Sequence, residues 1–148
     1  MNTPDLTALA TFAASWAVLN GTHGLADHVL GQTHAQAMGK AAPGRAGWLA
    51  DLRHVGAYHL VMAGAGALAW LALPLHWSPV GILVALAWSA GTHALLDRRW
   101  PVRWILRRTG SAGFADLADH GLNGMYLSDQ SLHTFALLIA AGMLAVIR

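Results

Sequence analysis

Four long apolar runs constrain the fold of this chain more than any other feature of its sequence. They extend over about residues 6–30, 54–73, 80–97 and 129–147. A helix needs about 20 apolar residues to cross the hydrocarbon core of a bilayer. Only helices and closed barrels satisfy their backbone hydrogen bonds in that core. The runs therefore predict an all-α, polytopic membrane protein, with four transmembrane helices bundled into a single domain over residues 1–148.

The composition agrees with a membrane protein and limits the chemistry that is available. The 148 residues are 55% hydrophobic and 11% charged, whereas soluble domains are about 25% charged. The sequence contains no cysteine, which excludes disulfides, thiolate metal sites and cysteine nucleophiles. Any metal must therefore be bound by nitrogen and oxygen ligands. The net charge of +2 comes from a few arginine-rich stretches, which indicate membrane topology and no nucleic-acid partner.

Lysine and arginine are concentrated in two of the three loops. Lys40, Arg45 and Arg53 lie in or just beyond the first loop, and five arginines lie within Arg98–Arg108 in the third. The second loop and the segment before the first run contain none. Because cytoplasmic loops carry the excess of basic residues, both basic loops are predicted to be cytoplasmic and both termini outside.

The stretch Arg98–Arg108 also contains two tryptophans, Trp100 and Trp104, among its arginines. Basic residues alternating with aromatic and aliphatic ones suit a segment that lies on a membrane surface and contacts anionic lipids. We therefore expect an amphipathic segment between the third and fourth transmembrane helices. A solvated basic loop is the alternative.

A repeated motif places histidine and aspartate at one end of the apolar runs. Thr-His-x-Leu-x-Asp occurs at Thr22–Asp27 and Thr92–Asp97, where it closes the first and third runs, and a reversed copy at Asp129–His133 opens the fourth. Residues four apart share one face of a helix. In the predicted topology all three pairs lie near the cytoplasmic leaflet. The charge bias and the histidine spacing are independent observations, and they agree.

The second run begins with two more histidines, His54 and His59, at the same predicted depth. They are five residues apart, which is about 140° around a helix. Only one of the two is therefore expected to face the polar layer directly.

These residues predict a site for one or two divalent metal ions. Ionisable groups at membrane depth are costly and usually functional. Imidazoles and carboxylates projecting inward from several helices suit zinc first, with manganese, iron and nickel as alternatives. The candidate ligands are His23, Asp27, His54, His59, His93, Asp97, Asp129 and His133. Asp27, Asp97 and Asp129 are also the candidate catalytic residues, because a carboxylate that does not hold the metal can serve as a general base.

Other interpretations of the polar layer remain open at this stage. The same residues could form a structural network that fixes helix register, or a path for protons or ions. Haem between two histidines is less compatible with the pattern, because a haem pocket needs apolar walls. Each paired histidine here has a carboxylate one turn away.

Four separated motifs, in order, resemble the domain of unknown function 3307 family of small bacterial integral membrane proteins. They are His23-Gly-Leu-Ala-Asp27 followed by Gln32, a histidine at the head of the second run, His93-x-x-x-Asp97 before a basic loop, and Asp129-Gln130-x-x-His133. Gln32–Ala37, Pro43-Gly44 and Asp97-Arg98-Arg99 resemble the variant found in actinobacteria and their phages. The resemblance covers about residues 20–137 and aligns His54 better than His59 with the histidine of the second helix. It implies the inner membrane of a bacterium and no settled activity.

The sequence supports three kinds of function. The first is a metal-dependent hydrolase acting on a lipid or phosphoester-like substrate. The second is a non-enzymatic metal-binding or transport module, and the third is a structural membrane partner. An open ligand position facing a lipid-sized groove would favour the hydrolase, whereas a continuous polar path to the far side would favour transport. The expected surroundings are the lipid bilayer, and a homo-oligomer is compatible with the pattern.

Overall fold

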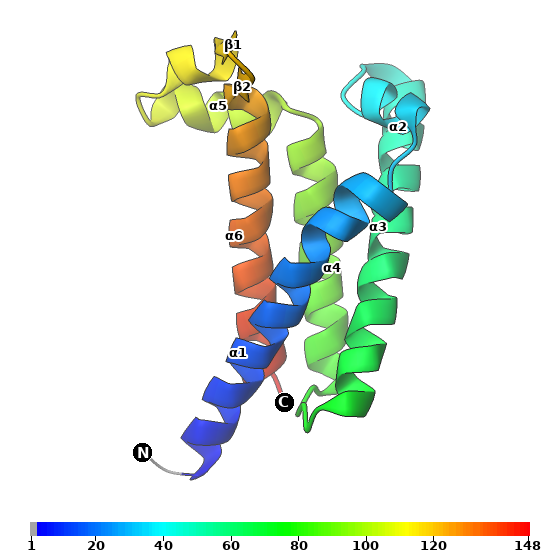
Figure 1. The fold of residues 1–148 in the computed structure, drawn as a ribbon, viewed down its shortest axis with the longest axis vertical. Helices are drawn as coiled ribbons and strands as arrows, with labels where there is room; N and C mark the ends of the chain where they lie inside the picture. Colours follow the sequence, from blue (N-terminus) through cyan, green and yellow to red (C-terminus); the bar gives the residue numbers. More distant parts are fainter. Residues whose placement is uncertain (1–2) are drawn as a thin grey trace.

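The computed structural model describes residues 3–148, which form six α-helices, short π and 3₁₀ segments and one small hairpin (Figure 1). The elements are α1 (Thr3–Gly24), the π-helix η1 (Leu25–Leu30), α2 (His34–Gly39), α3 (Gly44–Ala72), α4 (Pro79–Asp97), α5 (Trp100–Arg108), the 3₁₀ helix η2 (Ala112–Asp116), β1 (Ala118–Asp119), β2 (Leu122–Asn123) and α6 (Gly124–Val146). The two strands pair antiparallel. The all-α prediction is confirmed, with this hairpin as a minor addition.

Three of the helices, α3, α4 and α6, are long and apolar enough to cross a membrane. They run side by side, while α1 crosses them obliquely (Figure 1). Large apolar side chains point outward from α3, such as Leu60 and Leu71, each 77% exposed. Exposed apolar surface on this scale is expected where a protein faces lipid rather than water. The chain is therefore a membrane protein.

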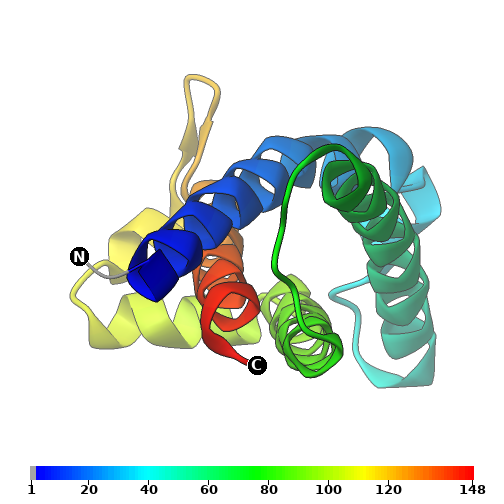
Figure 2. The ribbon, with the colours of Figure 1, turned by 90° about the horizontal axis from the view of Figure 1, so that it is seen from below.

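Helix α6 is the centre of the packing and contacts both α4 and α1 (Figure 2). Its buried face is rich in small residues, including Ala136, Ala140 and Ala141, which allow neighbouring helices to approach closely. The indole of Trp88 on α4 donates a 2.9 Å hydrogen bond to the carbonyl of Ala136. The buried interface between α4 and α6 thus combines close backbone contact with a specific polar bond.

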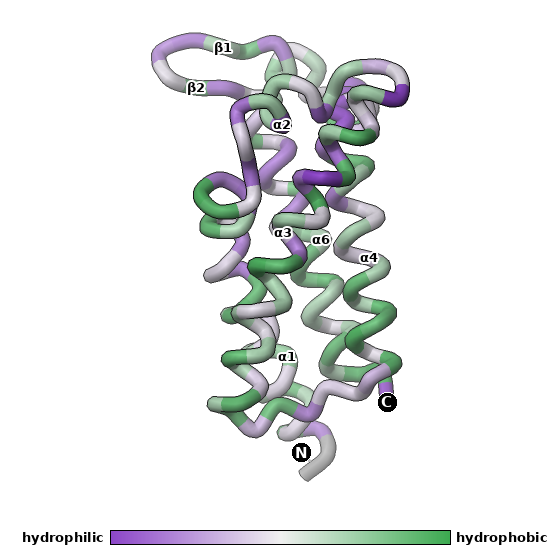
Figure 3. The backbone as a smooth tube through the Cα atoms, turned by 90° about the vertical axis from the view of Figure 1, so that its right-hand side faces the viewer, coloured by the Kyte–Doolittle hydropathy of each residue, from purple (hydrophilic) through white to green (hydrophobic). Residues whose placement is uncertain are grey.

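The polar segments gather at one end of the molecule (Figure 3). This end contains α2, α5, η2 and the hairpin, while α1 begins and α6 ends at the other (Figure 1). In α5, Val102 and Leu106 are buried against Ala115 of η2, whereas Trp100 and Trp104 are 63% and 54% exposed. The predicted amphipathic segment is therefore a helix with one buried face. We call this end of the molecule the basic end.

Local capping signals explain where the helices begin. Pro43 precedes α3, so this helix starts well before the predicted span 54–73 and ends one residue short of its end. Ser78 Oγ accepts a hydrogen bond from the amide of Gly81 at 2.9 Å and starts α4. Asn123 Oδ1 accepts one from the amide of Tyr126 at 2.9 Å and starts α6 ahead of the predicted residue 129. Composition marks the apolar part of each helix, and the caps set its true length.

Candidate metal centre

Four donor atoms from three elements converge inside the basic end. They are Asp27 Oδ1 on η1, His54 Nε2 on α3, and His93 Nε2 and Asp97 Oδ2 on α4, and we call them the four-donor centre. His54 Nε2 lies 2.9 Å from Asp27 Oδ1, 3.4 Å from Asp97 Oδ2 and 3.2 Å from His93 Nε2. His93 Nε2 lies 3.6 Å from Asp27 Oδ1 and 3.3 Å from Asp97 Oδ2. All four residues are at most 2% exposed.

Five of the six donor–donor distances in this centre are close to those between neighbouring ligands of zinc. Nitrogen and oxygen ligands lie about 2.0–2.1 Å from zinc, and the edges of the corresponding tetrahedron are about 3.3–3.4 Å long. The five distances within the four-donor centre run from 2.9 to 3.6 Å. Asp27, His54 and His93 form one triad of donors that could hold an ion, and His93, Asp97 and His133 form another.

The orientation of the His54 ring favours a cation at the same place. His54 Nδ1 donates a 3.0 Å hydrogen bond to the carbonyl of Gly31. Its Nε2 donates to Asp27 Oδ1 at 2.9 Å when it is protonated, whereas the neutral ring presents the Nε2 lone pair to the carboxylates of Asp27 and Asp97. A lone pair facing two carboxylates is repulsive, and a divalent ion would turn all three groups into ligands. Metal-binding histidines commonly donate their other N–H to a carbonyl in this way.

Asp27 reaches the centre because the helix widens into the π segment η1 immediately before it. The i→i+5 pattern of a π-helix changes which residues share a face. His23, on the preceding α-helical turn, therefore bonds elsewhere. Its Nδ1 lies 3.1 Å from the hydroxyl of Tyr58 and its Nε2 lies 3.1 Å from Gln130 Oε1.

Gln130 connects His23 to the centre. Its Nε2 donates a 2.9 Å hydrogen bond to Asp27 Oδ2, so its Oε1 accepts from His23 Nε2–H and the Tyr58 hydroxyl donates to His23 Nδ1. Both ring nitrogens of His23 are occupied in this chain of hydrogen bonds. His23 thus lies beside the four-donor centre and orients Asp27 through Gln130.

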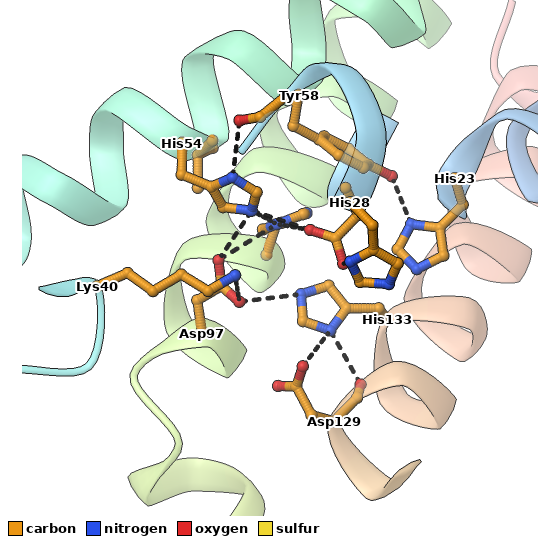
Figure 4. Close-up of polar contacts among 12 residues, drawn as sticks. His23, His28, Lys40, His54, Tyr58, Asp97, Asp129 and His133 are labelled. Atoms are coloured by element: carbon orange, nitrogen blue, oxygen red, sulfur yellow. Dashed lines mark hydrogen bonds and ion pairs between the residues drawn. The ribbon is translucent and has the colours of Figure 1, made fainter. Parts of the chain in front are cut away.

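A second group of ligands, His93, Asp97 and His133, adjoins the first and shares His93 and Asp97 with it (Figure 4). Asp97 Oδ1 lies 2.8 Å from Lys40 Nζ and 4.0 Å from His133 Nε2. His133 Nδ1 donates to the Asp129 carbonyl at 2.9 Å and lies 3.5 Å from Asp129 Oδ2. Within the described residues, His133 Nε2 and Asp129 Oδ1 are buried without a hydrogen-bond partner. Each of these two residues therefore keeps a donor atom free for a cation.

His59 lies next to these groups but is used differently. Its Nδ1 donates to the Val55 carbonyl at 2.8 Å and its Nε2 lies 3.1 Å from Ser89 Oγ. Its ring centre is 6.0 Å from that of His93. Of the two histidines at the start of the second apolar run, the structure brings His54 into the four-donor centre and leaves His59 beside it.

Lys40 is the residue at the centre that sequence reasoning missed. It is the only lysine in the chain, which is the signal that could have drawn attention to it. The Arg98 guanidinium donates to the carbonyls of Lys40 and Ala42 and lies 4.5 Å above the Trp48 ring. These contacts fix the segment after α2 in a position where the Lys40 ammonium lies next to Asp97. Asp51, 0% exposed, is a further buried carboxylate that the motifs did not reveal.

A polar cavity of about 340 Å³ opens onto the centre from the basic end. Asp27, Asp97 and Asp129 line it together with the cationic side chains of Lys40, Arg99 and Arg103. On the other side of the centre lies an apolar groove of about 420 Å³ between the helices, with Trp70 and Leu144 in its lining and His59 among its few polar groups. The centre therefore meets a charged cavity on one side and apolar surface on the other.

Comparison of the chain with protein-family models, curated proteins and solved structures finds no match. The resemblance to the domain of unknown function 3307 family stays a prediction from its motifs. The buried histidine and aspartate groups, which could hold a metal ion, are the structural basis for assigning a function.

Proposed function

We propose that this protein is a four-helix protein of the bacterial inner membrane that binds a divalent transition metal. The ligands are Asp27, His54, His93 and Asp97, and zinc is the first choice ahead of manganese, iron and nickel. The observation that carries this proposal is that five of the six donor–donor distances run from 2.9 to 3.6 Å, close to the edges of about 3.3–3.4 Å in a tetrahedral zinc site.

In this proposal α1 and η1 form the fourth transmembrane segment of a single domain. Helix α1 has 22 residues and η1 extends it by 6, which exceeds the roughly 20 residues that a span needs. The basic end faces the cytoplasm and both termini lie outside, in agreement with the positive-inside rule. The exposed tryptophans and arginines of α5 contact anionic lipids of the cytoplasmic leaflet.

We further propose that the centre hydrolyses a phosphoester-like substrate, either soluble or part of a lipid. A bound divalent ion would supply Lewis acidity and lower the pKa of a water molecule. Asp129 lines the same cavity as Asp27 and Asp97 and its Oδ1 has no hydrogen-bond partner among the described residues, so it is placed to accept a proton as general base. Lys40, Arg99 and Arg103 favour an anionic substrate in the cavity. Because four protein ligands fill a tetrahedral ion, turnover requires a fifth position on the cavity side.

The packing on the far side of the centre favours a hydrolase over an ion route. Between the centre and the end opposite α5, the helices bury apolar clusters that include Met62 and Leu137, and Ala85 and Leu144. An ion route would instead need polar groups along this length. A purely structural network differs from a hydrolase and from an ion route, because shared protons and no metal ion would hold the donor groups together.

Elemental analysis of the detergent-purified protein tests the proposal. We expect about one equivalent of zinc, and we expect a chelator to lower the melting temperature because the ion binds only the folded state. Metal-free protein with unchanged melting would support the structural network, and a Soret band would indicate haem.

Asp129→Asn should keep the metal and lose hydrolysis of a chromogenic phosphate ester. Equal hydrolysis by this variant would remove Asp129 from the reaction.

A further inference from the structure

We propose that the Lys40 ammonium occupies a second cation position of the centre and thereby limits it to one divalent ion. This inference rests on the proposed metal centre. It goes beyond that centre because it assigns a second ligand set and explains why a lysine is built into it.

The carboxylate of Asp97 faces both positions. Its Oδ2 lies 3.4 Å from His54 Nε2 and 3.3 Å from His93 Nε2, whereas its Oδ1 lies 2.8 Å from Lys40 Nζ. In two-metal sites the ions lie about 3.5–4 Å apart, close enough for one carboxylate to contact both. Here the geometry places the four-donor centre on one oxygen of Asp97 and the lysine on the other (Figure 4).

The second position has ligands besides Asp97. His133 belongs with His93 and Asp97 to a group whose donor atoms all lie within 4.8 Å of one another. Because His93 Nε2 is already a ligand of the first position, Asp97 Oδ1 and His133 Nε2 are the ligands of the second. His133 is 3% exposed, and because its Nδ1 donates to the Asp129 carbonyl, its Nε2 carries a lone pair. That nitrogen has no hydrogen-bond partner in the described part of the chain. This buried, unpartnered imidazole nitrogen lies 4.0 Å from Asp97 Oδ1 and is therefore available to bind a metal ion.

The charges of the centre balance with one divalent ion and one lysine. At the two positions, Asp27, Asp97 and Asp129 contribute three negative charges, and a divalent ion with Lys40 contributes three positive ones; nearby, the charges of the buried Asp51 and Arg98 oppose each other. A second divalent ion beside the lysine would leave two unbalanced positive charges in a buried site, which is costly. Without the lysine, one negative charge would remain, and it would favour a second cation.

Lys40 is held in place rather than free to swing out. Helix α2 starts with a capping box, in which Thr33 N donates to Gln36 Oε1 at 2.6 Å and Gln36 N donates to Thr33 Oγ1 at 3.3 Å. The Arg98 guanidinium fixes the carbonyl of Lys40 itself, and Lys40 is 9% exposed. Since its backbone is already ordered, only the rotamer freedom of the side chain is lost when the ammonium pairs with Asp97.

The metal content of three single variants tests this role. Each protein is stripped with a chelator, reloaded with excess zinc and desalted before elemental analysis. We expect about one equivalent in the wild type, about two in Lys40→Met, and about one in Lys40→Arg, which keeps a cation at the position. Methionine retains the apolar stem of lysine. The double variant Lys40→Met with His133→Ala should return to one equivalent, because the gained ion would lose its free imidazole ligand.

Each outcome has one meaning. Two equivalents in the wild type, or one in Lys40→Met, would overturn the role of Lys40 and leave the proposed metal centre intact. No metal in any of the proteins would overturn the proposed centre itself. If Lys40→Met does not fold, Lys40→Gln gives the same readout, with two equivalents expected and one contradicting the inference.

Discussion

At the scale of single residues, His54 and His59 form a matched pair on one helix. His54 Nε2 lies within 3.4 Å of three other donor atoms, whereas both ring nitrogens of His59 are used by Val55 and Ser89. We therefore predict that His54→Ala loses most of the zinc and that His59→Ala retains it, as measured by elemental analysis of the purified proteins. Loss of zinc from His59→Ala alone would show that the ligand set has been assigned wrongly.

Gln130 and His23 form a second pair, which separates orienting a ligand from being one. Gln130→Leu removes the bond to Asp27 Oδ2, and because loss of a group that orients a ligand typically costs 10–100-fold in metal affinity, we expect zinc affinity to fall by about that much. His23→Ala leaves the bond between Gln130 and Asp27 in place and should weaken zinc binding less. Competition with a chromogenic chelator measures both affinities. A larger effect of His23→Ala would mean that His23 itself binds the ion.

Regular helix geometry explains which of these residues could be predicted. His93 and Asp97 lie four apart in the continuous helix α4, and both contribute to the four-donor centre as their spacing predicts. His23 and Asp27 have the same spacing, but the π turn between them directs the two side chains to different partners. No motif indicates a π turn, and none indicates that a loop lysine folds back onto Asp97. Both depend on tertiary contacts.

At the scale of elements, Arg98 ties the segment after α2 to the end of α4. Its guanidinium donates to two carbonyl groups and stacks on Trp48, whereas a lysine ammonium is a point charge without the planar fork for this geometry. We predict that Arg98→Lys destabilises the protein by about 1–3 kcal/mol, because buried hydrogen bonds to a charged group are lost. Thermal and denaturant unfolding in detergent measure the change. The control is Arg107→Lys, at an exposed position of α5, and equal destabilisation of both variants would contradict the docking role of Arg98.

The elements themselves were predictable to different degrees. The apolar runs locate α3, α4 and α6, since a long apolar helix is what such runs form in a membrane. They do not show that α3 starts at Gly44, because Arg45, Asp51 and Arg53 interrupt the apolar composition of its first turns. The hairpin of β1 and β2 and the 3₁₀ helix η2 also lie outside the reach of hydropathy, since short segments of this kind are fixed by turns and by contact with α5.

At the scale of the whole molecule, the four-donor centre lies between two kinds of surroundings. The cavity above it contains Lys40, Arg99 and Arg103, and the groove below it is bounded almost entirely by apolar side chains. If the basic end is cytoplasmic, the centre is reached by polar molecules from the cytoplasm and by lipid from the bilayer. The orientation of the helices therefore decides which molecules can reach the centre.

Single-cysteine labelling tests that orientation without background, because the natural sequence contains no cysteine. Arg45 and Arg107 are exposed at the basic end, and His76 is exposed in the turn between α3 and α4. Helix α3 has 29 residues and is about 43 Å long, more than the roughly 30 Å of a hydrocarbon core. Cysteines at Arg45 and Arg107 should therefore react with a membrane-impermeant reagent only after the cell is opened, and a cysteine at His76 should react in intact cells. Reaction of the Arg45 and His76 positions from the same side would mean that α3 does not cross the membrane, and the histidine–aspartate pairs would then not lie at a common depth.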